Sequence, residues 1–111
     1  MKTFLIDPYT QTITQTTYSG NWRSIAPMIG CDYFTCITIN DDSDTLYVDD
    51  EGLLKDQAEM KYFRLKMSPD FNQTYAGKGM VLGSDPYTGD STDAICTLEW
   101  LQSVVSFPRT R

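Results

Sequence analysis

The sequence predicts an α+β fold, in which an antiparallel or mixed sheet of about five to six strands carries two short helices on one face. Short segments rich in β-branched and aromatic residues recur along the chain between turn residues, and two further segments have the spacing of amphipathic helices. A length of 111 residues is typical of one domain. We therefore expect a single α+β domain over residues 1–111.

The N-terminal segment predicts a β-hairpin. Residues 2–6 have the apolar character of a strand, and residues 11–18 alternate around Ile13 and are rich in threonine. Between them stands Asp7-Pro8-Tyr9-Thr10, in which Asp suits the first position of a turn and Pro pre-sets the backbone at the second. The same four residue types recur at positions 85–88. Because the flanks of the two copies do not match, we interpret them as independent turns and not as a duplication.

Two short helices are expected. Residues 19–30 have apolar residues at helical spacing, and Gly30 is a suitable stop. A second helix should begin after Thr97, whose side chain can cap it, and continue to about Val105. Their apolar faces consist of Trp22, Ile25, Met28 and Ile29 in the first helix and of Leu98, Leu101 and Val104 or Val105 in the second.

The middle of the chain predicts further strands. Residues 33–39 are dense in β-formers and are expected to form a central strand. Residues 60–67 alternate charged and apolar side chains, a pattern typical of an edge strand. The remaining expectations are strands at 45–48 and 78–83, a polar turn at 40–44, an acidic irregular segment at 49–59 with a helical turn near Leu53 and Leu54, and a loop at 68–77.

The charge of the chain is concentrated in one segment. The net charge is −6, and residues 41–59 hold eight carboxylates against a single base, Lys55. Such a segment is either a solvated surface or a recognition patch for a basic partner. Direct binding to nucleic acid is disfavoured, because neutralising phosphates requires clustered Lys and Arg. The candidate partner-binding residues are Asp41, Asp42, Asp44, Tyr47, Asp49, Asp50 and Glu51.

Residue types that are missing or scarce exclude several classes of chemistry. The chain has no histidine, so serine–histidine and cysteine–histidine catalysis are excluded. Its three cysteines, Cys31, Cys36 and Cys96, lie among apolar or aromatic neighbours and do not have the spacing of a zinc site. We therefore expect free thiols, no catalytic residues, no metal and no cofactor.

Three short motifs have a functional and a structural interpretation. Tyr47-Val48-Asp49-Asp50 is the string found at the catalytic carboxylates of reverse transcriptases, but this chain is far shorter than a polymerase, and a strand ending in an acidic turn is the simpler interpretation. The run from Asp42 fails the calcium-loop pattern, because Tyr47 stands where glycine is required. The glycines at 77, 79 and 83 flank a strand and do not open a helix, which favours a bulge or close strand packing over phosphate binding.

The segment Tyr47-Val48-Asp49-Asp50-Glu51-Gly52-Leu53-Leu54-Lys55 resembles the most recognisable part of the domain-of-unknown-function 3846 family. An opening strand leading to Asp-Pro-Tyr, a Trp-Arg-Ser-Ile helix ending at Gly30-Cys31-Asp32 and a late glycine-rich strand are similar as well. The resemblance spans nearly the whole chain apart from residues 55–75. It implies an intracellular accessory protein of a phage, plasmid or bacterial genome. The family suggests no particular activity, so the resemblance assigns no catalytic residue.

These observations lead to an expected function and its alternatives. We expect a non-enzymatic, cytoplasmic accessory protein of a phage or mobile element that binds a host protein through the acidic surface; homo-oligomerisation and a role in the virion stay open. The N-terminal segment lacks the apolar run of a signal peptide, and no run is long enough to span a membrane. The alternatives are a magnesium-dependent phosphoesterase and a protein that sequesters a nucleotide. For the nucleotide site, the candidate ligand-binding residues are Arg23, Arg64 and Lys78.

Overall fold

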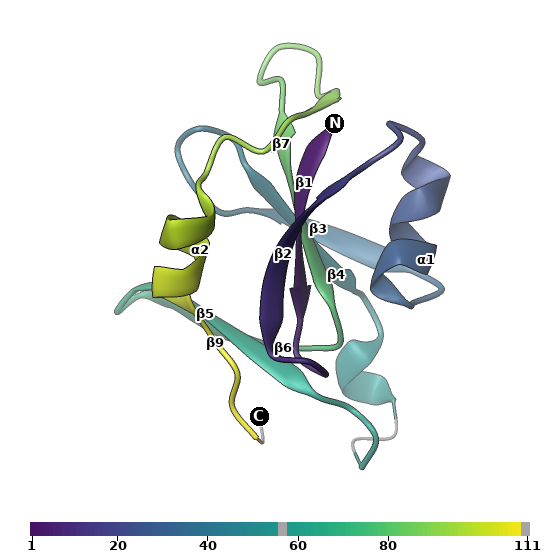
Figure 1. Cartoon of the computed structure of the whole chain (residues 1–111), viewed down its shortest axis with the longest axis vertical. Helices are drawn as coiled ribbons and strands as arrows, with labels where there is room; N and C mark the ends of the chain where they lie inside the picture. The colour runs from purple at the N-terminus through teal and green to yellow at the C-terminus, as the bar shows by residue number, and fades with distance from the viewer. Residues whose placement is uncertain (56–57, 110–111) are drawn as a thin grey trace.

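A computed structural model describes residues 1–55 and 58–109 and shows an α+β fold with two antiparallel sheets (Figure 1). The larger sheet has six strands, with five in the order β2-β1-β7-β4-β3 and β8 paired to β7. Its strands are β1 (Lys2–Asp7), β2 (Thr12–Thr17), β3 (Phe34–Thr38), β4 (Thr45–Asp49), β7 (Gly79–Ser84) and β8 (Ser91–Thr92). The smaller sheet has the order β6-β5-β9, from β5 (Tyr62–Ser68), β6 (Phe71–Ala76) and β9 (Val105–Ser106).

The predicted turns have the same local geometry. Asp7 Oδ1 accepts the backbone N–H groups of Tyr9 and Thr10, at 2.9 and 3.4 Å. Asp85 Oδ1 accepts those of Tyr87 and Thr88, at 2.8 and 3.3 Å. The first turn joins β1 to β2 in the expected hairpin, and the second lies between β7 and β8. The repeated tetrapeptide therefore marks two turns that use the same side-chain-to-backbone hydrogen bonds.

The helices are short and capped as expected. A 3-10 turn, η1 (Trp22–Ser24), leads into α1 (Ile25–Ile29), which ends at Gly30 in the left-handed conformation at φ 72°. α2 (Leu98–Val104) begins at Thr97, whose hydroxyl accepts the N–H of Trp100 at 3.1 Å. Trp22 was expected on the buried face of the first helix, but it is 61% exposed, because the 3-10 turn breaks the helical spacing that would have aligned it with Ile25.

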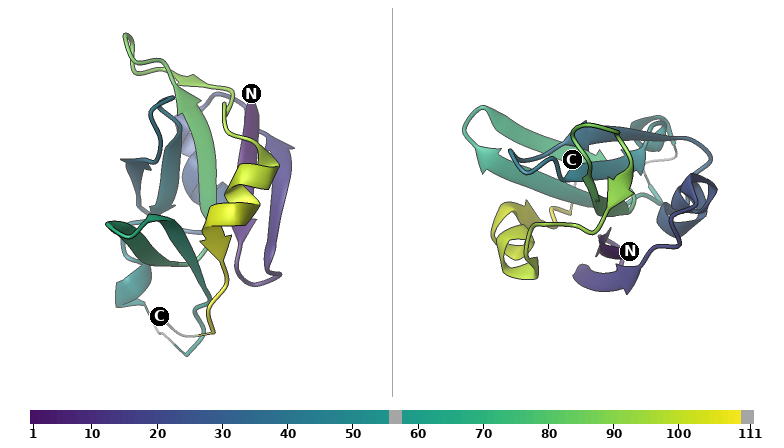
Figure 2. Two further views of the ribbon diagram at one scale, coloured as in Figure 1. Left: turned by 90° about the vertical axis from the view of Figure 1, so that its left-hand side faces the viewer. Right: turned by 90° about the horizontal axis from the view of Figure 1, so that it is seen from above.

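The two helices lie on opposite faces of the larger sheet, which corrects the expectation that they share one face (Figure 2). Side chains alternate along each strand, so β7 sends Met80 and Leu82 into a core with α1 and Val81 into a core with Leu101 of α2. The second core also contains Phe63 and Leu65 of β5. A strand that is apolar on both sides has to be covered on both faces of the sheet. Met80, Val81 and Leu82 make β7 a strand of this kind.

Three strand expectations are also corrected. β3, expected to be central, is an edge strand of the larger sheet, and β5, expected at an edge, is the middle strand of the smaller sheet. Within the loop expected at 68–77, Phe71–Ala76 forms β6 and pairs with β5. Phe71, Thr74 and Tyr75 of β6 are residue types that are common in strands, so the loop prediction underestimated the strand propensity of this segment as well as its pairing.

Two glycines of β7 permit close packing, as the sequence predicts. A Cβ on Gly79 would lie 2.7 Å from the Phe63 ring, where the two sheets meet. A Cβ on Gly83 would clash with the carbonyl oxygen of Asp93. These contacts are too short for any side chain, so the glycines let the second sheet and the 91–93 segment approach β7.

Among the described residues, no helix is long and apolar enough to cross a bilayer.

Candidate partner-binding surface

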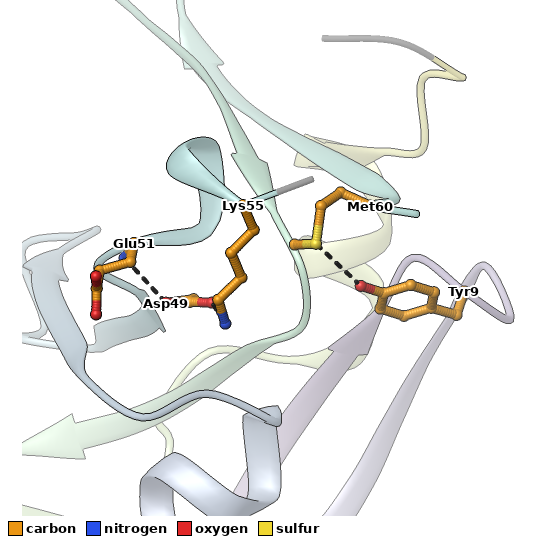
Figure 3. Close-up of polar contacts among 5 residues, drawn as sticks. All are labelled: Tyr9, Asp49, Glu51, Lys55 and Met60. Carbon is orange, nitrogen blue, oxygen red and sulfur yellow. Dashed lines mark hydrogen bonds and ion pairs between the residues drawn. The ribbon is translucent and has the colours of Figure 1, made fainter. Parts of the chain in front are cut away.

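The acidic segment is organised around the carboxylate of Asp49, at the end of β4. Its Oδ2 lies 2.5 Å from Lys55 Nζ, and its Oδ1 accepts the backbone N–H of Glu51 at 2.9 Å (Figure 3). The Asp49 side chain is only 4% exposed. The hydrogen bond to Asp49 raises the pKa of the Lys55 ammonium above its usual 10.5. Asp49 therefore closes the segment from 49 to 55 into a compact turn and is not presented to solvent.

The backbone of this turn is held against the rest of the protein. Residues Gly52–Leu54 form a 3-10 turn, η2, in which Leu54 N–H donates to Glu51 O at 3.0 Å. Gly52 is buried, and a Cβ there would lie 2.7 Å from the carbonyl oxygen of Ala76 in β6. On the other side, Asp50 N–H donates to Tyr33 O at 3.0 Å. The turn is thus fastened to both sheets.

The held turn presents apolar side chains to solvent. Leu54 is 83% exposed and Leu53 is 45% exposed, and Tyr33, joined to Asp50 through the backbone, is 67% exposed. Asp50 and Glu51 are exposed beside them. We call Tyr33, Asp50, Glu51, Leu53 and Leu54 the turn surface. It combines three large apolar side chains with two carboxylates on a turn whose backbone is hydrogen-bonded at Asp50 and Glu51.

Asp44, expected on the acidic surface, is instead fully buried. Its Oδ1 accepts the N–H of Ile95 at 2.8 Å, and its Oδ2 accepts the N–H of Cys96 at 2.7 Å and the amide Nδ2 of Asn40 at 2.8 Å. Burial and the nearby Asp44 charge raise the pKa of the Cys96 thiol to about 12. A buried carboxylate needs such donors, and these tie the segment before α2 to the β3–β4 turn.

The other predicted residues do not form one continuous patch. Asp41 and Asp42 are exposed in the β3–β4 turn, whereas Asp50 and Glu51 follow the far end of β4. The five residues of β4 separate its two ends by about 13 Å. Tyr47 lies half-buried in the core beneath α1, with its ring 5.6 Å from that of Phe34, and burial raises the pKa of its hydroxyl. Tyr47 is therefore a packing residue.

The alternative ligand-binding residues have three different surroundings. Arg23 lies in η1 with its guanidinium 5.1 Å from the Trp22 ring. Arg64 lies in β5 and donates from Nε to Thr74 Oγ1 at 3.2 Å, and Lys78 lies 4.0 Å from Asp7 Oδ2. The three residues come from three different places in the fold: η1, β5 and the segment that precedes β7.

A different basic groove was not anticipated from the sequence. It has a volume of about 390 Å³ and is lined by Pro8, Tyr9, Thr10, Gln11, Lys61, Pro108 and Arg109. Its two charged lining residues are both cationic, in a chain of net charge −6. No sequence signal joined Arg109 to Lys61, because the two residues lie far apart in the chain.

Comparison of the sequence with known protein families identifies the family of this chain. A family model described as a domain of unknown function (DUF3846) matches residues 1–103. The chain belongs to the DUF3846 family. The match includes the segment from Tyr47 to Lys55, in which this DUF3846 protein builds its Asp49–Lys55 turn. No curated protein and no solved structure matches. In the part of the chain that the structure describes, no three His, Cys, Asp or Glu side chains are grouped so as to hold a metal ion.

Proposed function

We propose that this DUF3846 protein is a non-enzymatic binding protein that docks on a host protein through the turn surface. The observation that carries this proposal is the exposure of Leu54, at 83%, on a turn whose backbone is held by Asp49, Lys55 and Gly52. Exposing a leucine costs solvation free energy, and holding it still removes much of the entropy lost on binding. An apolar side chain on a turn that is already held in place loses less conformational entropy when a partner covers it, and this supports a docking role for the turn surface.

The carboxylates beside the leucines suggest the chemistry of the partner. Asp50 and Glu51 are exposed and flank the apolar side chains, so a complementary partner has an apolar pocket with basic residues at its rim. Asp41 and Asp42 lie at the other end of β4 and are left out of this interface. Activity on behalf of a phage or mobile element, within a bacterial host, is part of the same proposal.

The test uses two baits that lose the same charge at different places. Asp50→Asn with Glu51→Gln removes two carboxylates from the turn surface, and Asp41→Asn with Asp42→Asn removes two from the β3–β4 turn. Affinity capture from a bacterial host extract, read by mass spectrometry, gives the candidate partner, which is then purified and titrated against each variant. We expect the first variant and Leu54→Ser to weaken binding by about tenfold or more, and the second to retain it.

The salt dependence of binding distinguishes the contribution of the carboxylates of the turn surface from that of its apolar side chains. Binding of the original chain should weaken between low and physiological ionic strength, and the dependence should be smaller in the Asp50→Asn, Glu51→Gln variant. Leu54→Ser should weaken binding at every ionic strength. A partner that binds all three variants equally would overturn the assignment of the turn surface.

A second candidate function is favoured by the basic groove. Lys61 and Arg109 line it together with Tyr9, a residue that is 47% exposed. Two cations beside an exposed aromatic ring suit an anionic ligand with a planar group, such as a nucleotide. Isothermal titration with AMP and with inorganic phosphate tests this, against a variant with Lys61→Gln and Arg109→Gln. Binding of AMP that the double variant loses would support the nucleotide function, and equal heats from both proteins would refute it.

A further inference from the structure

The outer side of β3 is an open sheet edge. β3 ends the strand order of the larger sheet opposite β2, and none of the strands in the described ranges pairs with its outer side. An open edge leaves backbone N–H and C=O groups without a ladder partner, which makes it a template for another strand.

The ladder to β4 shows which groups face outward. Asp50 N–H donates to Tyr33 O, and Ile39 N–H donates to Asp44 O, so Tyr33 and Ile39 belong to hydrogen-bonded pairs with β4. Hydrogen-bonded and non-hydrogen-bonded residue pairs alternate along an antiparallel ladder. The register therefore places Thr35 and Ile37 in hydrogen-bonded pairs with β4 as well. The N–H and C=O groups of Phe34, Cys36 and Thr38 therefore point to the open side.

The edge lacks the features that usually block strand pairing. From Phe34 to Thr38 there is no charged residue and no proline. The side chains of Thr35, Cys36 and Thr38 are exposed. Phe34 and Ile37 are half-buried, one in each core, so both cores end at this strand with apolar surface only partly covered. A further strand would cover both.

We propose that a second copy of this chain pairs with this edge, β3 against β3 in antiparallel register about Cys36. This register places Cys36 opposite Cys36 and Phe34 opposite Thr38, so that every outward group of the three residues meets a complementary group. Strand pairing about a two-fold axis makes a self-complementary interface, the common form in homodimers. The two larger sheets then become one continuous sheet.

The charges near β3 are compatible with this register. Continuing the pairing beyond the strand sets Asp32 opposite Asn40 and Asp41 opposite Cys31, so that no carboxylate faces another. β2, at the other edge, also lacks charge, but five of its six side chains are exposed and leave little apolar surface for a second copy to cover. These differences favour β3 over β2 as the dimer edge.

The first experiment measures mass against concentration by analytical ultracentrifugation. We expect the wild-type chain to pass from monomer to dimer as its concentration rises. Cys36→Lys sets two cations side by side across the two-fold axis, and Thr38→Pro removes an outward N–H that β4 does not use. Each should raise the dissociation constant about tenfold or more. Gln15→Lys places the same charge on the β2 edge and should leave the dissociation constant of the dimer unchanged.

Cross-linking and salt give independent readouts. A short bismaleimide should join Cys36 to Cys36, identified by mass spectrometry of the linked peptide. Because each copy carries a net charge of −6, added salt should strengthen dimerisation, opposite to its effect on the acidic turn surface. A chain that stays monomeric at every concentration overturns the proposal. A dimer lost in Gln15→Lys but kept in Cys36→Lys overturns it too, by assigning the contact to β2.

Discussion

Asp44 and Ile95 are joined by a hydrogen bond of 2.8 Å across 51 residues of the chain, with the carboxylate fully buried. The same carboxylate also accepts from Cys96 and Asn40. One residue of the acidic segment thus fastens the segment that leads into α2 to the β3–β4 turn. The acidic segment therefore contains a carboxylate with a structural role inside the protein as well as carboxylates exposed on its surface.

Removal of the Asp44 carboxylate should be strongly destabilising. Asp44→Ala leaves two backbone N–H groups and the Asn40 amide without their acceptor, and we expect the free energy of unfolding to fall by about 2–4 kcal/mol. Asp42→Ala, two residues away and exposed, should change it by less than about 0.5 kcal/mol. Urea denaturation followed by fluorescence measures both. Equal effects of the two variants would contradict the structural role of Asp44.

The ion pair between Lys55 and Asp49 predicts a pH dependence. The pKa of Lys55 is raised above 10.5, so its contribution to stability is complete below about pH 10.5 and is lost as the pH rises through the folded-state value. Because the Lys55 side chain is 37% exposed, the contribution is about 0.5–1 kcal/mol. The stability difference between the wild type and Lys55→Met should persist from pH 7 to 9 and vanish at higher pH. A difference that stays constant above pH 11 would count against the pair.

Gly52→Ala should destabilise the turn through a backbone contact. The added Cβ would lie 2.7 Å from the Ala76 carbonyl oxygen, which belongs to a paired strand and moves only with β6. We expect a loss of about 1–3 kcal/mol and weaker partner binding, because the turn surface would shift. Glu51→Ala, at the exposed neighbouring position, is the control for stability. Unchanged unfolding of Gly52→Ala would show that the turn is not clamped against β6.

The contact between the two sheets can be tested with a compensating pair. Gly79→Ala alone should cost about 1–3 kcal/mol, because its Cβ would meet the Phe63 ring at 2.7 Å. Phe63→Leu alone should also destabilise, since Phe63 is fully buried. The double variant should be more stable than the sum of the two losses, by at least about 0.5 kcal/mol. Additive losses in the cycle would place the clash elsewhere.

The three thiols should react at different rates. Cys36 is exposed, whereas burial raises the pKa of Cys31 and raises that of Cys96 to about 12. Only the thiolate reacts, so at pH 8 iodoacetamide should modify Cys36 first and Cys96 last. Peptide mass spectrometry over time gives the order. Early modification of Cys96 would contradict its packing beside Asp44.

The sequence by itself determined the local structure: the hairpin, the two Asp-Pro-Tyr-Thr turns, the caps at Gly30 and Thr97, and the class of fold. These features depend on residues a few positions apart, whose side chains contact the neighbouring backbone. Only the tertiary structure decided which strands are edges, on which faces the helices lie, and which carboxylates are inside. Asp42 and Asp44 are the same residue type two positions apart, and one is buried because Ile95 and Cys96 supply N–H groups from a distant segment. Local sequence carries no record of such partners.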